Sequence, residues 1–538
     1  MTHSSRHRHW SRLPNWLAIV LLFLLVAQAA MVVPAGAQNL DSRVLPQLLK
    51  EAAERPGDTF RVIVTRIDNN RGADNALAAQ GGRKLKEVGN VGFAANVPGR
   101  AIEALGRNRA VKFVSYDAPM RKTGTVDYSR LTTLYPEAAQ ATKVWLGDKF
   151  TSPYTGTGVG VAVLDTGISQ TFGAGTLRGD WKAADGSNRI LAQVKYSSNT
   201  NNMSDSHGHG TAVAGVLAGN SWYHKTRSLQ GKYIGIAPEA NLVNVKVSDD
   251  QGMSYVSDVV NAIEWVIANR VTYNIRVMNL SLVSSVAESY KTSVLAGAAE
   301  RAWFNGIFVV VAAGNSGADT LKYAPANDPF VVTVGAADLI ETADKSDDNV
   351  APWSSYGLTQ DGFSKPEIVA PGRRMVTTLA STTSVMAKVL PAQIVSTEYI
   401  RISGTSFAAP VVAGIAALAF QAHPEWTNDQ LKWLLTNTAT VLGSGYWETV
   451  TRADGSTSQV WVVTNPYPGQ GAGTASANKV VTYKSVPLFA NQGLAISDWL
   501  VTTDGTTNYS SANWSSANWS SANWSTATFQ SLPEGMVD

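Results

Sequence analysis

The chain has 538 residues, of which 44% are hydrophobic and 16% charged, so it can bury a large core and is not a disordered polypeptide. Its formal net charge is +3, and the arginines of the first 37 residues account for all of it. A neutral body argues against a nucleic-acid partner, because binding to nucleic acid needs a basic surface. The chain has no cysteine, so no disulfide stabilises it.

Residues 1–37 are typical of a secretory signal peptide. The basic stretch RHRHWSR precedes the apolar stretch LAIVLLFLLVAQAA, and Ala35-Gly36-Ala37 forms a small-residue cleavage site. An uncleaved membrane anchor is the alternative, because the apolar stretch is long. We therefore expect a secreted protein that is extracellular or associated with the cell surface.

Residues 38–120 form a unit of their own. The sequence predicts strands at 61–67 and 110–117, helices at 73–82 and 99–108, and a hairpin over 83–98. The resulting order β-α-β-β-α-β is the split βαβ arrangement of a ferredoxin-like α+β domain.

Residues 121–487 show a different pattern, in which apolar strands alternate with helices. Nearly continuous apolar runs, as expected for buried parallel strands, occur at 159–165, 241–247, 275–282 and 306–315. Helical windows follow at 210–219, 256–269, 290–303 and 406–421. This alternation predicts an α/β fold, a doubly wound and mostly parallel sheet with helices on both faces.

Residues 488–538 form a low-complexity tail in which the pentapeptide SSANW recurs. Aromatic residues stand five positions apart, at Tyr509, Trp514, Trp519, Trp524 and Phe529. Such a segment is either an inert stalk or a module that contacts the cell surface or a polysaccharide.

Three polar residues stand at element ends beside glycine. Asp165 ends the strand VGVAVLD, His209 begins a helix in DSHGHGTAVAG, and Ser406 opens a helix in SGTSFAAPVVAG. Each has a structural alternative: Asp165 as a turn residue, Ser406 as a helix N-cap, and His209 as a metal ligand with His207 and Asp205. The H-x-H spacing alone is a weak zinc signal.

Together these residue types indicate nucleophilic catalysis. A serine needs a neutral imidazole to accept its proton, and the imidazole needs a carboxylate to fix its tautomer. A fourth window, VVVAAGNSG, adds Asn315, whose amide can stabilise the oxyanion that forms when a carbonyl is attacked.

The windows VAVLDTGIS, GHGTAVAG, VAAGNSG and SGTSFAAPVVAG resemble the subtilisin-like (subtilase) serine peptidases. The order Asp…His…Ser is that of subtilisin, and Ser406 lacks the G-x-S-x-G elbow of α/β-hydrolases. The similarity covers roughly residues 136–486, and the unit at 38–120 resembles the propeptide of these enzymes.

The resemblance implies a secreted serine endopeptidase that is made as a zymogen and processes itself. Ser406 would be the nucleophile, His209 the general base and Asp165 its partner, with Asn315 in the oxyanion hole. The propeptide would be an intramolecular chaperone and inhibitor. A catalytically inactive relative that acts as a binding protein is the rival hypothesis, and the presence of all four groups argues against it.

The resemblance also implies that a peptide or protein substrate lies extended between two backbone edges. Backbone pairing makes few demands on sequence, and the expected pocket contains no acid, so we expect broad specificity without a strict preference for Lys or Arg. The residues assigned to substrate binding are Gly252, Ser254, Ser281, Leu282, Val283 and Gly314.

Among the departures of the sequence from the family pattern, three concern whole segments or the substrate edge. Val283 stands where glycine is usual at the pocket edge, and residues 381–399 are an insertion without a counterpart. The loop 221–233 lacks the calcium-ligand pattern of subtilisin, so structural calcium has no recognisable site, and other acidic loops are the alternative place for it. The chemistry itself requires no cofactor.

Overall fold

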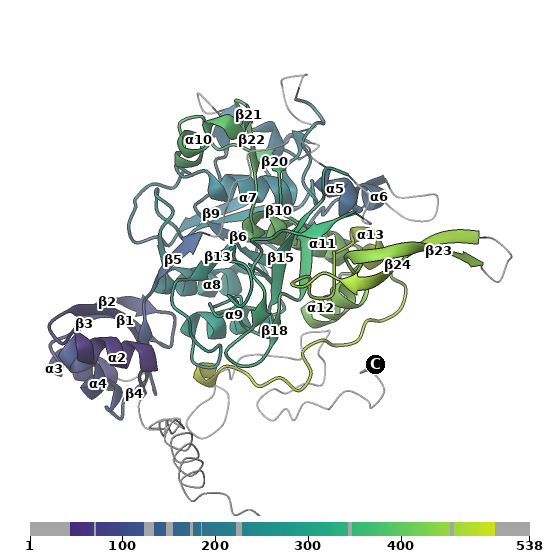
Figure 1. Ribbon diagram of the computed structural model, residues 1–538. Helices are drawn as coiled ribbons and strands as arrows, with labels where there is room; N and C mark the ends of the chain where they lie inside the picture. The colour runs from purple at the N-terminus through teal and green to yellow at the C-terminus, as the bar shows by residue number, and fades with distance from the viewer. Residues whose placement is uncertain are drawn as a thin grey trace, which may run out of the picture.

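The computed structural model describes residues 43–68, 71–122, 134–146, 154–172, 176–183, 185–221, 229–342, 347–451 and 457–500. The signal peptide expected at 1–37 and the repeats expected after residue 508 lie outside the described residues. A small N-terminal unit has a hydrophobic core of its own and lies beside a larger α/β unit (Figure 1), and its residues Ile63, Val88 and Ala94 belong to the core of the larger unit.

The N-terminal unit has the predicted strand and helix order. Its antiparallel sheet has the strand order β2-β3-β1-β4, which is the split βαβ topology. A helix before the first strand, α2, was not predicted. The elements are α2 (Pro46–Glu54), β1 (Thr59–Arg66), α3 (Gly72–Ala79), β2 (Arg83–Val88), β3 (Gly92–Pro98), α4 (Gly99–Gly106) and β4 (Val111–Tyr116).

An eight-stranded sheet forms the centre of the larger unit, with the order β16-β15-β14-β12-β6-β10-β9 and β19 beside β15. All pairs are parallel except β15 with β16. The doubly wound, mostly parallel α/β fold is therefore confirmed. Its strands are β6 (Gly160–Asp165), β9 (Ile190–Lys195), β10 (Asn241–Lys246), β12 (Ile275–Leu280), β14 (Phe308–Ala312), β15 (Val332–Asp338), β16 (Asn349–Val350) and β19 (Ile368–Pro371).

Two pairs of helices pack on this sheet. Helix α7 (His209–Ala218) lies against α11 (Thr405–Ala422), and α8 (Val256–Asn269) lies against α9 (Val294–Phe304). Among the described residues, α11 has the length and composition of a membrane span, but it is buried as a core helix. The other helices are α5 (Tyr135–Ala138), α6 (Ala141–Leu146), α10 (Val385–Val389), α12 (Asn428–Asn437) and α13 (Ala477–Val481).

Smaller sheets surround the central one. The strand β5 (Pro119–Lys122), which follows the N-terminal unit, lies between β11 (Ser254–Tyr255) and β13 (Leu282–Ser284). The insertion at 381–399 contains α10 and β21 (Ile394–Ser396). Strand β21 pairs with β22 (Tyr399–Ile402), which in turn pairs with β20 (Met375–Thr378), so the three strands form one sheet. The remaining elements are β7 (Thr171–Phe172), β8 (Thr176–Leu177), β17 (Gly357–Leu358), β18 (Ser364–Lys365), η1 (Gly179–Trp181), η3 (Pro391–Gln393) and η4 (Asp498–Leu500).

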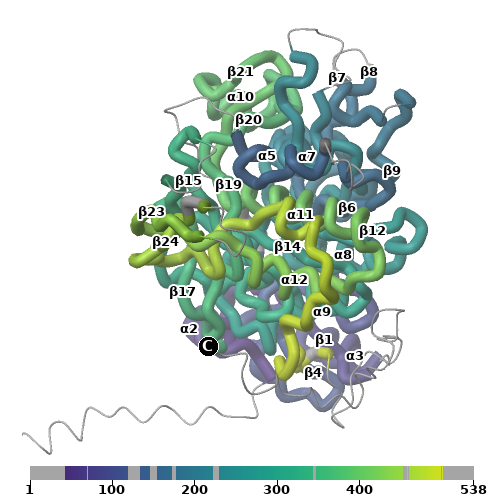
Figure 2. The backbone as a smooth tube through the Cα atoms, turned by 90° about the vertical axis from the view of Figure 1, so that its right-hand side faces the viewer, coloured from purple at the N-terminus to yellow at the C-terminus, as the bar shows by residue number. Residues whose placement is uncertain are grey.

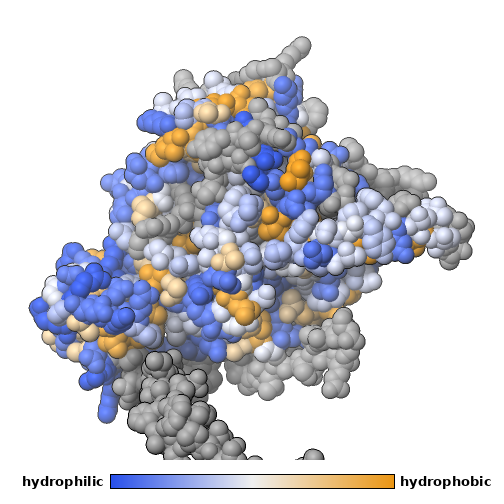
Figure 3. All heavy atoms as spheres, viewed as in Figure 1, coloured by the Kyte–Doolittle hydropathy of each residue, from blue (hydrophilic) through white to orange (hydrophobic). Residues whose placement is uncertain are grey.

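A long hairpin projects from the larger unit (Figure 1). It is formed by β23 (Gly443–Thr451) and β24 (Thr457–Pro466), and Tyr446 and Trp447 on it are exposed. The surface of the N-terminal unit in the same view is mostly hydrophilic (Figure 3), as expected for a domain that covers its own core.

The packed part of the chain continues to Leu500, beyond the expected boundary at 487. The backbone N–H of Asn491 donates to Asp429, and that of Ser497 donates to Glu300. Figure 2 shows this C-terminal segment running past α12 and α9 toward the N-terminal unit. We call residues 487–500 the C-terminal strap.

Candidate active site

Asp165 is the last residue of β6, the strand at which the sheet order reverses. Strands β10 and β12 pair with β6 on its two sides, and such a switch point is where open α/β sheets form a crevice at their carboxyl ends. The residues of β6 are all buried, so the strand is a rigid support for its terminal carboxylate. One carboxylate oxygen accepts a hydrogen bond from the backbone N–H of Thr166, at 2.7 Å.

His209 begins α7 and contacts Asp165 directly. Its Nδ1 lies 2.8 and 2.9 Å from the two carboxylate oxygens. A carboxylate oxygen accepts, so Nδ1 is the donor in this contact, and in the neutral imidazole Nε2 then carries the lone pair. That Nε2 is buried and has no hydrogen-bond partner among the described residues. The imidazole is therefore held in the tautomer that can accept a proton.

Ser406 lies in the first turn of α11 and is completely buried. The ring of the next residue, Phe407, packs against the His209 imidazole with centroids 5.2 Å apart, so the first turn of α11 lies against the histidine. The Ser406 hydroxyl donates to the carbonyl oxygen of Ser281 at 3.4 Å. The hydroxyl is thus directed toward an expected substrate edge.

A proline inside α11 explains a second contact between Ser406 and Ser281. Pro410 has no N–H, so the carbonyl of Ser406, four residues earlier, lacks its helical donor. The Ser281 hydroxyl donates to this carbonyl at 2.8 Å, and the side-chain amide of Asn279 donates to the Ser281 hydroxyl at 2.9 Å. The two serines therefore hold each other in place.

Asn315 follows β14 and uses only one end of its amide within the fold. Its Oδ1 accepts from the backbone N–H of Thr405 at 2.9 Å and from the Thr405 hydroxyl at 3.2 Å. Its Nδ2 is buried without a hydrogen-bond partner among the described residues. An anchored amide with an unused donor, next to the residue that precedes Ser406, suits an oxyanion that forms at the serine.

The two expected substrate edges are occupied by the chain itself. In β5, Met120 pairs with Ser254 on one side and with Ser284 on the other. Arg121 pairs with Val283, and Lys122 with Leu282. Valine at position 283 therefore does not prevent strand pairing at this edge. Gly252 lies in the turn before β11, outside the described ladder.

Gly314 contacts Thr405, the residue that precedes Ser406. The backbone N–H of Gly314 donates to the Thr405 hydroxyl at 3.0 Å, and its φ of +107° is in the region that favours glycine. This glycine therefore fixes the chain between β14 and the start of α11.

The structure gives Asp205 a role that differs from metal binding. Its carboxylate accepts hydrogen bonds from the Thr166 hydroxyl, the Gly208 N–H, and the N–H and hydroxyl of Thr211. These donors use both carboxylate oxygens, and the described residues contain no cluster of three or more metal-ligating side chains. Sequence reasoning missed this network because two of its four donors are backbone groups and a third comes from Thr166, 39 residues away.

Comparisons with known proteins agree with this geometry. Residues 156–473 match the Subtilase family. The serine protease AprX of Bacillus subtilis (strain 168) is 39% identical over 293 residues, which cover 53% of this chain and 61% of that protein. Alkaline elastase YaB of Bacillus sp. (strain YaB) is 31% identical over 345 residues, which cover 64% of this chain and 72% of that protein.

A solved structure has the same fold. Fervidolysin from Fervidobacterium pennivorans, a keratinolytic enzyme related to subtilisin, superposes with a TM-score of 0.57 at 21% identity, covering 80% of this chain and 62% of its own. At that identity the likeness concerns the fold alone. The family match extends over more than half of the sequence, and the chain therefore belongs to the subtilase family.

Proposed function

We propose that this protein is a secreted serine endopeptidase that is made as a self-processed zymogen. The observation that carries the proposal is the Asp165–His209 pair, whose buried Nε2 has no hydrogen-bond partner among the described residues, with the first turn of α11 packed against the imidazole through Phe407. The predicted signal peptide supports export.

In the first half-reaction the Ser406 oxygen attacks the substrate carbonyl carbon while its proton passes to His209 Nε2. For this transfer the hydroxyl must leave the Ser281 carbonyl, to which it donates at 3.4 Å, and turn to the imidazole. The oxyanion receives the Asn315 amide and the Ser406 backbone N–H at the positive end of α11. His209 then protonates the leaving amine, and an acyl-enzyme remains.

In the second half-reaction water replaces the amine. His209 takes a proton from water, which attacks the acyl carbon, and the proton returns to the Ser406 oxygen as the ester breaks. Asp165 stays ionised throughout and stabilises the imidazolium. These steps use the four side chains, the Ser406 backbone N–H and water. Binding of the substrate backbone between β11 and β13 supports broad specificity.

The N-terminal unit is proposed to inhibit the enzyme as a substrate-like segment. Its continuation, β5, fills the slot between β11 and β13. The unit also docks on α8: the Asp117 carboxylate accepts from the backbone N–H and the hydroxyl of Ser257, at 2.8 and 2.9 Å. An acid is favoured at a helix N-terminus, and Arg61 pairs with the same carboxylate at 2.7 Å.

Further contacts tie the unit to the same helix. The side chain of Asn261 accepts from the Gly89 N–H at 2.8 Å and donates to the Glu87 carbonyl at 3.0 Å. Lys86 forms an ion pair with the buried Asp258. These contacts favour an inhibitor that stays bound after the connecting chain is cut.

The strand register also suggests which bond is cut. Lys122 lies opposite Leu282, one residue short of Ser281, whose carbonyl accepts from the nucleophile. We therefore infer that processing occurs within two residues after Lys122, where the sequence reads Thr123-Gly124.

The direct test compares the wild-type chain with Ser406→Ala. Wild type should react with a fluorophosphonate and release a fragment whose C-terminus, read by mass spectrometry, follows Lys122 by one or two residues. Ser406→Ala should remain full length and unlabelled. Processing of purified Ser406→Ala at the wild-type rate would refute self-cleavage, and an unlabelled, inactive wild type would refute the peptidase.

Residues 501–538 lie outside the described residues, and their function is a separate proposal. We propose that the aromatic repeats contact the cell surface or a polysaccharide. Retention of the full chain, but not of a chain ending at 500, on insoluble cell-wall polysaccharide would support this role. Equal elution of both would leave the repeats as a stalk.

A further inference from the structure

We propose that Asp205 is a positioning residue that holds Asp165 and His209 in register for proton transfer. This inference rests on the proposed peptidase function and assigns to the reaction a carboxylate outside the triad. Asp205 is buried, and both its oxygens take two donors at 2.6–2.8 Å.

One set of these donors flanks His209 on both sides. Gly208 precedes the histidine and donates its N–H at 2.7 Å, and Thr211 follows it by two residues and donates its N–H at 2.8 Å and its hydroxyl at 2.6 Å. These N–H groups lie at the start of α7, where helical partners are lacking. Asp205 therefore fixes the backbone from which the imidazole projects.

The other donor connects Asp205 to the triad carboxylate. Thr166 follows Asp165 directly, and its hydroxyl donates to Asp205 at 2.7 Å while accepting the N–H of Gly210 at 2.9 Å. The end of β6 and the start of α7 are thus joined through one carboxylate and one hydroxyl. A displacement of either element would strain the same short hydrogen bonds.

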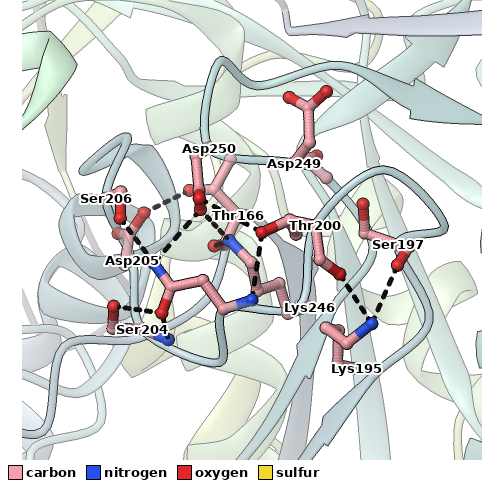
Figure 4. A network of polar contacts seen from close by, with 12 residues as sticks. Thr166, Lys195, Ser197, Thr200, Ser204, Asp205, Ser206, Lys246, Asp249 and Asp250 are labelled. Atoms are coloured by element: carbon pink, nitrogen blue, oxygen red, sulfur yellow. Dashed lines mark hydrogen bonds and ion pairs between the residues drawn. The ribbon is translucent and has the colours of Figure 1, made fainter.

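A buried lysine holds the far side of Thr166 (Figure 4). The ammonium group of Lys246 donates a hydrogen bond to the Thr166 carbonyl at 2.6 Å, and its Nζ lies 3.4 Å from Oδ1 of Asp250. Lys246 pairs with Asp165 in the register of β10 with β6. Thr166 is therefore held at its carbonyl by Lys246 and at its hydroxyl by Asp205, which leaves the Asp165 carboxylate little freedom to move.

The test is Asp205→Asn, which keeps the size of the side chain. Each oxygen of Asp205 faces at least one N–H, so either orientation of the new amide sets its NH2 group against a donor. Misplacement of catalytic groups by about 1 Å can cost ~10²-fold, so we expect kcat to fall ~10–100-fold with KM changed less than about twofold. The rate of self-processing should fall in parallel.

Asp429→Asn is the matched control, because Asp429 is also buried and accepts backbone N–H bonds, but from the C-terminal strap. Its kcat should stay within about twofold of wild type, whatever the change in thermal stability. Wild-type kcat in Asp205→Asn, or an equal loss in both variants, would overturn the inference.

A spectroscopic measurement covers the case in which Asp205→Asn is processed too slowly for kinetics. In the full chain carrying Ser406→Ala, the proton shared between His209 Nδ1 and Asp165 should give a low-field NMR resonance. Asp205→Asn should shift or broaden it while circular dichroism shows an intact fold. An unchanged resonance would overturn the inference, whereas an inactive wild type would instead contradict the proposed peptidase.

Discussion

At the scale of single residues, Asn315 uses only one end of its amide within the fold. Its Oδ1 is anchored by Thr405, its Nδ2 has no hydrogen-bond partner among the described residues, and in the proposed mechanism Nδ2 donates to the oxyanion. We expect Asn315→Leu to lower kcat ~10²–10³-fold, which is the known cost of removing the equivalent donor from subtilisin, with KM nearly unchanged. Steady-state kinetics on a soluble peptide would measure this.

Thr405→Val is the control for anchoring. It removes the hydroxyl that contacts Asn315 at 3.2 Å but keeps the backbone N–H bond and the amide donor. Its kcat should therefore fall far less than that of Asn315→Leu. Equal losses in the two variants would mean that the effect comes from the position of the loop.

Glu288 makes stability depend on pH. Burial raises the pKa of this carboxyl from 4.5 to about 7, although a hydrogen bond from Ser293 opposes the shift. Because the pKa is higher in the folded state, the carboxyl contributes to the stability of the fold. This contribution is complete below pH 4.5 and is lost as the pH rises through 7. The stability of Glu288→Gln relative to its parent should therefore be up to ~3 kcal/mol more favourable at pH 8 than at pH 4.

The measurement is the free energy of denaturant unfolding at pH 4, 6 and 8, in a Ser406→Ala background that prevents self-digestion. The difference between Glu288→Gln and its parent should grow with pH. Parallel curves would show that Glu288 does not titrate in this range.

At the scale of elements, α11 depends on a hydroxyl from outside the helix. Ser281→Ala removes the hydroxyl that donates to the buried Ser406 carbonyl, and Pro410 cannot supply the helical N–H in its place. We expect a loss of ~1–3 kcal/mol in the free energy of unfolding and a lower kcat. Pro410→Ala restores a helical N–H, so the double variant should recover part of both losses.

A double-mutant cycle measures this coupling. Ser281→Ala should cost less in the Pro410→Ala background than in wild type. Additive effects would contradict the account of the freed carbonyl.

The sequence predicted the elements that bear the site, but not the contacts between them. Asp165, His209 and Ser406 could be placed at the ends of elements because strand ends and helix starts carry recognisable local patterns. The roles of Asp205 and of the Ser281 hydroxyl depend on partners 39 and 125 residues away, or on backbone groups, which leave no local pattern. The pairing of β5 with β11 and β13 could not be predicted either, because those strands lie far away in the sequence and no local pattern indicates which strands pair.

At the scale of the whole molecule, composition placed the boundary of the fold too early. Residues after 487 look polar and irregular, yet Asn491, Ser497 and Leu500 are buried. Their burial depends on acids in distant helices, Glu300 and Asp429, that accept backbone N–H bonds. Burial raises the pKa of both carboxyls, to about 6 for Asp429.

Truncation separates the C-terminal strap from the tail. A Ser406→Ala chain ending at 500 should unfold at the same temperature as the full chain. In a chain ending at 487 the free energy of unfolding should fall by at least ~3 kcal/mol, because several buried hydrogen bonds are lost and two buried acids lose their donors. Calorimetry would measure both, and equal midpoints would show that the strap contributes nothing.

The central position of β5 has a consequence for which targets can be cut. A segment that replaces it must offer both backbone edges at once, one to β11 and one to β13. A residue already inside a helix or a sheet has committed those groups to its own fold. The enzyme would therefore attack proteins where they open locally, so that a target's resistance to digestion would report its own folding equilibrium more than its sequence.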